Sequence, residues 1–246
     1  MPAMNLLAFE LSTEACSVAV LAGGEVRERH EIAPRKHAEY ALPWAEALLV
    51  EAGIAKSAID AVAVGRGPGA FTGVRLGISI TQGIALALDV PAVPVSTLRA
   101  LAMRALPLGA GAGDRVLAAI DARMREVYVA RFRLEAGADG LLDAIADGDE
   151  AVMPPDAVPA PDGDGPWFGV GTGFGALDGV LRQRFAGRLL AVDAEALPHA
   201  ADVARLAAAA LRRGEGIAPE RLEPAYLRNA VALTLAEQQA LRASRA

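Results

Sequence analysis

The chain has 246 residues, of which 53% are hydrophobic and 22% charged, so it can bury a substantial core as one large domain or two similar lobes. Its formal net charge of −6 argues against a self-sufficient nucleic-acid binder, because phosphate contacts need clustered Lys and Arg and the sequence has no such cluster. The single cysteine, Cys16, excludes an internal disulfide and a cysteine-based zinc site, and is typical of a reducing cytoplasm.

The first residues, MPAMNLLAFELS, have no basic segment, and their apolar run ends at Glu10. This pattern predicts neither a signal peptide nor a membrane span. We therefore expect a cytoplasmic protein with no membrane partner.

The first half of the chain predicts a three-stranded meander followed by alternating helices and strands. Strands are expected at 5–11, at 17–21 and after Gly23 and Gly24. The periodicity then predicts helices at 37–53 and 72–88, with short strands at 61–65 and 92–95. Such alternation is typical of an α/β sheet.

The second half begins with a similar pattern. An apolar strand over 115–121 ends at Asp121, and a polar turn at 122–125 leads into a strand over 126–133, just as the first strand ends at Glu10. The repeat predicts two lobes, an N-terminal one over 1–105 and a C-terminal one over 106–246. Within the second lobe we expect a mobile loop near 137–165, a strand and glycine turn over 167–175, a helix over 200–213, and a tail, EPAYLRN, that packs back onto the body.

The two helices of the first half carry more apolar surface than one core-facing side can bury. Two interpretations remain open: both helices are sandwiched inside the domain, or they form an oligomer surface. Gly73, Gly77 and Gly83 each weaken the second helix by about 1 kcal/mol relative to Ala, which favours close approach of another helix.

Residues 65–77, GRGPGAFTGVRLG, predict a special turn that opens a helix. Glycine permits positive φ and close approach of a phosphate, and Thr72 is expected to cap the helix. A possible nucleotide or anion site therefore comprises Ser12, Thr13, Gly67, Gly69 and Thr72. The alternative is that the glycines serve only a tight strand-to-helix turn.

Other motifs give weaker indications. GRGPGA fits the degenerate G-x-G-x-x-A pattern of dinucleotide-dependent oxidoreductases, but Asp89 precedes a strand where a ribose-binding acid should end one, and no P-loop lysine follows. His30, His37 and His199 lack metal-ligand spacing, and Cys16 is expected to be a small buried hydrophobe.

A carboxylate pair leaves an enzymatic alternative open. Glu10 and Asp121 end equivalent hairpin strands, where they either orient a metal-bound water or simply cap their turns. The first case would make the protein a metal-dependent phosphotransferase or peptidase that works in the cleft between the lobes.

Six segments resemble, in order, the signature segments of the TsaB (YeaZ) family of bacterial tRNA threonylcarbamoyladenosine biosynthesis proteins. They are AFELSTEACSVAVL, RKHAEYALPWAEALL, GRGPGAFTGVRLGISITQGIALAL, VPVSTLRALA, AAIDARMREVYVA and EPAYLRN. The resemblance implies a duplicated α/β fold of the actin-like, sugar-kinase-like ATPase superfamily, with two lobes.

The resemblance also implies a non-catalytic accessory subunit. Such a subunit forms a heterodimer with a paralogue, TsaD, which holds the metal and transfers a threonylcarbamoyl group to the adenine beside the tRNA anticodon; an ATPase, TsaE, joins them. The chain itself would have no catalytic residue, metal or cofactor, since ATP, ADP and a divalent metal belong to the complex. It would meet tRNA only through the complex and form a homodimer when alone.

Two departures bear on the site. A TsaD-type metal pair needs two histidines on the first helix, whereas His37 is followed four residues later by Ala41, and Glu10 replaces the superfamily's usual aspartate, which argues against tight nucleotide binding. The family's pairing surface maps onto the two apolar helices, with Trp44, Leu48, Leu76 and Ile80 expected to dominate. The full expected partner interface is His37, Tyr40, Ala41, Trp44, Leu48, Thr72, Arg75, Leu76, Ser79, Ile80 and Gly83.

Overall fold

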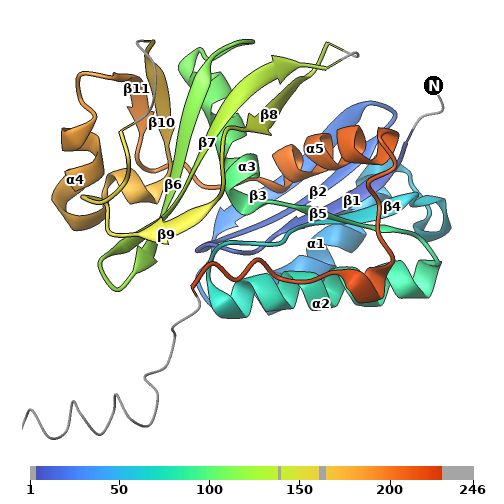
Figure 1. The fold of residues 1–246 in the computed structure, drawn as a ribbon. Coiled ribbons are helices and arrows are strands. Elements are labelled where there is room, and N and C mark those ends of the chain that lie inside the picture. Colours follow the sequence, from blue (N-terminus) through green and yellow to red (C-terminus); the bar gives the residue numbers. More distant parts are fainter. Residues whose placement is uncertain (1–3, 138–139, 161–164, 229–246) are drawn as a thin grey trace, which may run out of the picture.

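In the computed structural model, which describes residues 4–137, 140–160 and 165–228, two lobes lie side by side and each is built on one mixed β-sheet (Figure 1). The first sheet has the order β3-β2-β1-β4-β5. Its strands are β1 (Leu6–Glu10), β2 (Ala15–Ala22), β3 (Glu25–Ile32), β4 (Ala61–Gly65) and β5 (Ala92–Val95). The first three form the predicted antiparallel meander, and β4 and β5 run parallel to β1.

The second sheet repeats this topology with the order β11-β10-β6-β7-β8, and β9 pairs with β7. Its strands are β6 (Arg115–Arg123), β7 (Glu126–Ala136), β8 (Leu142–Ala146), β9 (Ala151–Met153), β10 (Trp167–Val170) and β11 (Leu189–Asp193). The meander β6-β7-β8 corresponds to β1-β2-β3, and the parallel strands β10 and β11 correspond to β4 and β5. The predicted duplication is confirmed.

One stretch of the second lobe differs from expectation. The segment near 137–165 is not a single loop, because β8 and β9 lie within it and pair with β7. The mobility expected for its remainder stays a prediction, and 138–139 and 161–164 lie outside the described residues.

The helices cover the first sheet on both faces. α1 (His37–Ala52) and α2 (Phe71–Leu88) lie on one face, and α5 (Ala200–Arg212) lies on the other (Figure 1). The remaining helical elements are α3 (Thr97–Ala102), α4 (Ala176–Arg184), and the 3-10 segments η1 (Lys56–Ala58), η2 (Met103–Leu108), η3 (Thr172–Phe174) and η4 (Pro219–Arg221).

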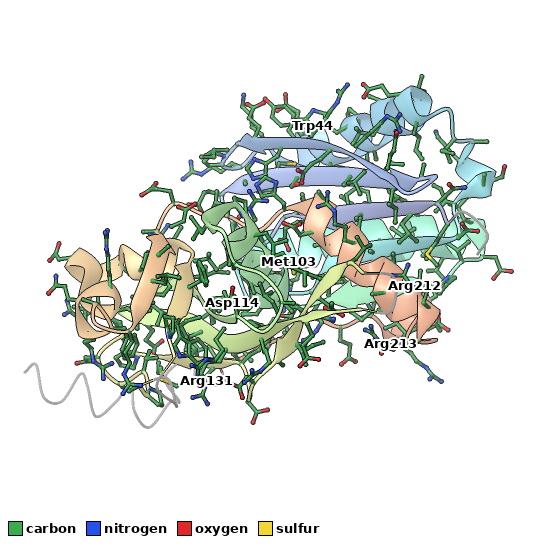
Figure 2. All side chains as sticks on the ribbon, turned by 90° about the horizontal axis from the view of Figure 1, so that it is seen from above. Trp44, Met103, Asp114, Arg131, Arg212 and Arg213 are labelled. Atoms are coloured by element: carbon green, nitrogen blue, oxygen red, sulfur yellow. The ribbon has the colours of Figure 1, made fainter. Side chains whose placement is uncertain are left out.

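A continuous core joins the two lobes. Leu6 of the first sheet and Val116 of the second belong to one cluster of buried apolar side chains, which α3, η2 and α5 complete. Met103, at the start of η2, is buried in the middle of this cluster and lies between the lobes in Figure 2. The lobes are therefore packed against each other without a polar gap at this level.

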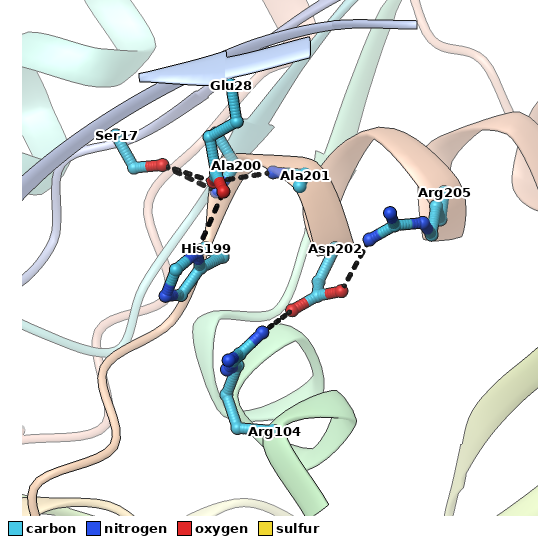
Figure 3. Close-up of polar contacts among 8 residues, drawn as sticks. All are labelled: Ser17, Glu28, Arg104, His199, Ala200, Ala201, Asp202 and Arg205. Atoms are coloured by element: carbon cyan, nitrogen blue, oxygen red, sulfur yellow. Dashed lines mark hydrogen bonds and ion pairs between the residues drawn. The ribbon is translucent and has the colours of Figure 1, made fainter. Parts of the chain in front are cut away.

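α5 corrects the predicted division at residue 105, because it follows the second sheet in sequence but packs on the first. The helix contacts β1, β2, β3, β4 and β5. At its N-terminus, Ser17 Oγ accepts the Ala200 amide (2.9 Å), and the Glu28 carboxylate accepts the Ala201 amide (3.0 Å) and His199 Nδ1 (2.8 Å) (Figure 3). The expected C-terminal lobe thus contributes a structural element to the N-terminal one.

The interpretation that α1 and α2 are sandwiched inside the domain is wrong. Their outer faces expose large apolar side chains, among them Leu42 (51%), Val50 (76%) and Leu86 (59%). By length and composition alone α2 could cross a membrane, which holds for no other helix of the described residues. In this fold it packs on β1 and β4, as a helix of a layered α/β domain does.

The tail returns to the body, as predicted. The Ala225 amide donates to Arg66 O (2.9 Å), and Arg75 Nε donates to Tyr226 OH (2.7 Å). Arg228 Nη2 donates to Ala122 O (3.2 Å), so the tail crosses from the first lobe to the second. Residue 229, the last of the predicted segment, lies outside the described residues.

Candidate functional site

A cleft of about 1090 Å³ opens between the lobes. The turn after β1, the N-terminal part of α2, the β6–β7 turn and the tail line it. Four of the five residues of the predicted anion site lie in its wall: Ser12, Thr13, Gly69 and Thr72. Gly67 does not line the cleft, and its amide donates to Thr97 Oγ1 (3.2 Å).

Three glycines of the 65–77 segment are explained by close neighbours within the chain. A Cβ at Gly65 would overlap the Glu10 carboxylate, one at Gly69 would overlap the Ser12 carbonyl, and one at Gly73 would overlap the Leu11 carbonyl. The Ala70 amide donates to Ser12 O (2.6 Å), which fixes the first hairpin against the start of α2. The glycines therefore let two backbone segments meet, which favours the structural alternative over phosphate binding.

The expected cap of α2 is also corrected. The helix begins at Phe71 with Ala70 as its N-cap residue, and no side chain supplies a capping hydrogen bond. Thr72 is exposed and faces the cleft. Asp89 ends α2 in the left-handed conformation and follows no strand, so it does not stand where dinucleotide-binding folds place their ribose-binding carboxylate.

Glu10 and Asp121 have different environments, because Asp121 lines the cleft and Glu10 does not. The Glu10 carboxylate is buried and accepts hydrogen bonds from the Ser12 amide (2.9 Å), Ser12 Oγ and Thr97 Oγ1 (3.3 Å). Burial raises its pKa above the usual 4.5. Asp121 does line the cleft, but it is bonded to the Arg123 amide (2.8 Å) and Nη1 (3.0 Å). The enzymatic alternative therefore gains no support.

The candidate metal and nucleophile residues have structural roles. His37 Nε2 lies 3.0 Å from Thr13 O and 3.1 Å from Ala15 O, and because carbonyl oxygens only accept, it carries the proton and ties the hairpin turn to α1. Cys16 is buried, and burial raises the pKa of its thiol to about 12. Over the described parts of the chain, no group of three or more His, Cys, Asp or Glu side chains is placed to hold a metal ion.

The expected partner-interface residues fall into three classes. Thr72, Arg75, Ser79 and Gly83 are exposed, and His37, Tyr40, Trp44, Leu76 and Ile80 are half-buried. Ala41 and Leu48 are buried in the chain's own core, so the expectation for these two is corrected. Trp44 stacks on Tyr40 with ring centroids 4.9 Å apart, and in Figure 2 it lies on the first lobe, far from Arg131 of the second.

The three glycines of α2 have different environments. A Cβ at Gly73 would overlap the Leu11 carbonyl, and one at Gly77 would lie 3.1 Å from the Val64 side chain, so both are explained within the chain. A Cβ at Gly83 would meet no described atom within 4 Å. Of these three glycines, Gly83 is the one that the fold of the chain does not require.

Sequence reasoning missed several residues of these surfaces. Phe71 (60% exposed) and Leu86 (59%) extend the outer face of α2, and Leu42 of α1 lines a groove of about 400 Å³ together with Gly83. Tyr226 and Arg228 of the tail line the cleft. The apolar excess of both helices indicated that side chains such as Phe71, Leu86 and Leu42 would be exposed. The contacts of the tail depend on long-range packing, which leaves no local pattern in the sequence.

The comparisons with known proteins agree with this architecture. The family model described as TsaD, tRNA N6-adenosine threonylcarbamoyltransferase, matches residues 29–235. A protein of Escherichia coli (strain K12) named tRNA threonylcarbamoyladenosine biosynthesis protein TsaB is 40% identical, over 93% of this chain and 96% of its own length. A Haemophilus influenzae protein with the same name is 38% identical, over 93% of this chain and 95% of its own length.

Among solved structures, one titled YeaZ from Pseudomonas aeruginosa has a TM-score of 0.80 and 46% sequence identity, and the match covers 91% of this chain and all of that one (100%). Sequence and fold thus agree over nearly the whole length. The chain belongs to the TsaB (YeaZ) family of tRNA threonylcarbamoyladenosine biosynthesis proteins, with the two-lobed fold that this family shares with TsaD.

Proposed function

We propose that this chain is a non-catalytic accessory subunit of bacterial tRNA threonylcarbamoyladenosine biosynthesis. It pairs with a TsaD-like paralogue through the outer face of α1 and α2 and activates that paralogue for modification of the adenine beside the anticodon. We call this face the pairing surface and define it by its exposed residues outside the cleft: Leu42 of α1 and Ser79, Gly83 and Leu86 of α2.

The observation that carries the proposal is Gly83. A glycine inside a helix lowers helix stability by about 1 kcal/mol relative to alanine, and the described chain has no atom that an added methyl group would displace. Its place in mid-helix is explained if a second molecule brings a helix close to α2 there. Ser79, one turn earlier on the same face, is small and exposed as well.

Exposed apolar side chains near Gly83 support the same interpretation. Leu42 of α1 is 51% exposed and lines the groove that Gly83 also lines, and Leu86 of α2 is 59% exposed. A small-residue centre flanked by large apolar groups fits helix-on-helix packing, which a partner would complete.

The internal hydrogen bonds of the candidate catalytic groups support a non-catalytic role. Glu10 bonds to Ser12 and Thr97, and His37 bonds to backbone carbonyls, so both groups tie parts of the chain together. In this proposal the TsaD-like paralogue supplies the metal, ATP and ADP belong to the complex, and a TsaE-like ATPase joins it. The complex works in the cytoplasm, and the chain forms a homodimer through the same surface when the paralogue is missing.

The test is the mass of the complex in solution. Light scattering on the chain alone, and on the chain mixed with its TsaD-like paralogue, should give a homodimer and a heterodimer respectively. Leu86→Glu places a charge in the pairing surface without touching the core and should abolish both. Leu190→Glu is the matched control, because Leu190 is exposed to a similar degree (64%) on β11 of the other lobe.

A second variant separates pairing from folding. Gly83→Ala should leave the free energy of unfolding equal or higher, since the site has room for a methyl group, yet weaken the heterodimer. The proposal fails if Leu86→Glu and Gly83→Ala pair with the paralogue as tightly as the wild type.

A further inference from the structure

The turn between β6 and β7 has an unusual backbone. Arg123, Met124 and Arg125 all have positive φ values, of 60°, 54° and 64°. Two-residue hairpin turns of this hand are normally made by Asn and Gly, because other side chains are strained there. In this chain the same positions hold three long side chains.

Arg123 and Met124 line the cleft, and Arg125 follows them in the turn. Met124 is 71% exposed, and the Arg123 side chain is 82% exposed. Arg125 is exposed too, and no described carboxylate is paired with it. Asn or Gly would satisfy the fold at these positions with less strain, so the fold alone does not account for three long side chains there.

The cleft wall has a charge opposite to that of the whole protein. Four arginines line it, Arg35, Arg75, Arg123 and Arg228, against two carboxylates, Glu14 and Asp121, although the chain has a net charge of −6. Asp121 is bonded to Arg123, and Glu126 is paired with Arg228, which leaves Arg35 and Arg75 as the cleft arginines with no carboxylate partner among the described residues. An excess of arginine at one cleft of an acidic protein indicates a polyanion as its ligand.

Exposed aromatic rings stand on the opposite wall of the cleft. Phe71 (60% exposed) and Tyr226 (51%) lie with ring centroids 6.3 Å apart. The Arg75 guanidinium lies 3.7 Å from the Phe71 ring centroid and donates to Tyr226 OH, which fixes both rings in place. Aromatic rings and guanidinium planes are the groups on which unstacked bases of single-stranded nucleic acid stack.

We propose that the mouth of the cleft is a binding site for single-stranded RNA, with Arg123 and Arg125 of the strained turn on its phosphates and Phe71 and Tyr226 under its bases. This inference rests on the proposed function and deepens it, because it gives the accessory subunit a contact of its own with the RNA. Because the chain is acidic overall, it binds RNA weakly by itself, and this contact adds to the stronger RNA binding of the partner subunit.

The experiment measures RNA binding by fluorescence anisotropy, for the chain alone and for its mixture with the TsaD-like paralogue. The probes are an RNA hairpin with the sequence of a tRNA anticodon stem and loop, and a fully paired RNA of equal length. The unpaired loop should bind more tightly than the paired RNA. Arg125→Glu should weaken loop binding severalfold and reduce the slope of log affinity against log salt by about 0.7, the value for one single-strand phosphate contact.

Two variants control for charge and for folding. Arg182→Glu, on the exposed face of α4, makes the same change of net charge away from the cleft and should leave the slope unchanged. Arg125→Gly relieves the positive φ, so the chain should be no less stable while RNA binding weakens. Equal slopes for Arg125→Glu and wild type, or no RNA binding by either sample, would overturn the inference.

Light scattering on the same samples keeps the two proposals apart. If the chain fails to pair with the paralogue but loop binding depends on Arg125, the accessory role is refuted and the RNA site stands. If Arg125→Glu disrupts pairing and leaves loop binding of the chain unchanged, the turn is a protein contact and the RNA site is refuted.

Discussion

His30 of β3 and His199, the residue before α5, stack face to face, with ring centroids 3.9 Å apart and planes 2° from parallel. His199 donates Nδ1 to Glu28 (2.8 Å), whereas His30 Nε2 is buried and has no hydrogen-bond partner among the described residues. Burial lowers the pKa of His30, and the nearby charges of His199 and Arg104 lower it further, against the opposing effect of Glu28. The folded state therefore favours the neutral form of His30.

Because of this stack, we expect the free energy of unfolding to decrease as the pH is lowered. The folded-state pKa of His30 lies below its ordinary value of 6.5, so the stabilising contribution is fully present above that value and is lost as the pH falls through it. Urea unfolding between about pH 8 and pH 5 should show the decline. His30→Phe keeps a stacked ring without a titrating group, and it should reduce the slope by up to about 1.4 kcal/mol per pH unit, the value for one proton. An unchanged slope would mean that other groups control the pH dependence.

Glu28 should be the strongest single anchor of α5. Its carboxylate accepts Ser17 Oγ (2.7 Å), the Ala201 amide and His199 Nδ1 (Figure 3), and these hydrogen bonds outweigh burial and lower its pKa to about 2. Glu28→Ala leaves all three donors without an acceptor and should lower the free energy of unfolding by about 3 kcal/mol at pH 7. Because the folded pKa is depressed, this contribution is lost as the pH falls from 4.5 towards 2. Glu25→Ala, at an exposed position of the same strand, is the control and should change stability by less than about 0.5 kcal/mol.

The elements that the sequence predicts well are those with a strong local pattern. Strands β1, β2 and β4 are buried along their whole length and therefore read as uninterrupted apolar runs. Strands β8 and β9 were missed because they are short and lie among Asp, Gly and Ala. Their pairing with β7 is a tertiary contact, and it overrides the loop-like composition of the segment.

The candidate site shows the same limit. The glycines of 65–77 predicted a special backbone, but only the structure shows that the close neighbours are the carbonyls of Leu11 and Ser12, brought there by a hairpin some sixty residues away in sequence. Likewise, the apolar excess of α1 left the rotation of the helix undetermined. Packing against β2 buries Leu48, which was expected at the partner interface, and leaves Leu42 exposed.

Two glycines of one helix should respond to alanine in opposite directions. Gly73→Ala forces a methyl group onto the Leu11 carbonyl and should lower the free energy of unfolding by about 1–3 kcal/mol, because the backbone segments must separate. Gly83→Ala meets open space and should raise it by about 0.5–1 kcal/mol through helix propensity. Guanidinium chloride titrations of both variants decide the matter, and equal effects would mean that the close approach at Gly73 does not constrain the fold.

A substitution at Glu10 should change the stability of the chain without changing the activity of its complex. Glu10→Gln keeps an acceptor for Ser12 and removes the ionisable group, and its amide NH2 can donate to Thr97 Oγ1, which now donates to the carboxylate. The folded-state pKa of Glu10 is raised, so its favourable contribution is fully present below the usual 4.5 and is lost as the pH rises through the folded value. Gln should therefore stabilise the chain at pH 7, by on the order of 1 kcal/mol, and this gain should shrink as the pH falls below about 4.5.

Glu10→Ala is the matched structural control. It leaves Ser12 and Thr97 facing a buried void and should cost about 2–3 kcal/mol at neutral pH. Because Glu10 is buried and does not line the cleft, the complex of Glu10→Gln with the TsaD-like paralogue should form and transfer threonylcarbamoyl to tRNA at the wild-type rate. A stable, correctly paired Glu10→Gln complex with severely reduced transfer would assign the buried carboxylate a part in the reaction and contradict the accessory role.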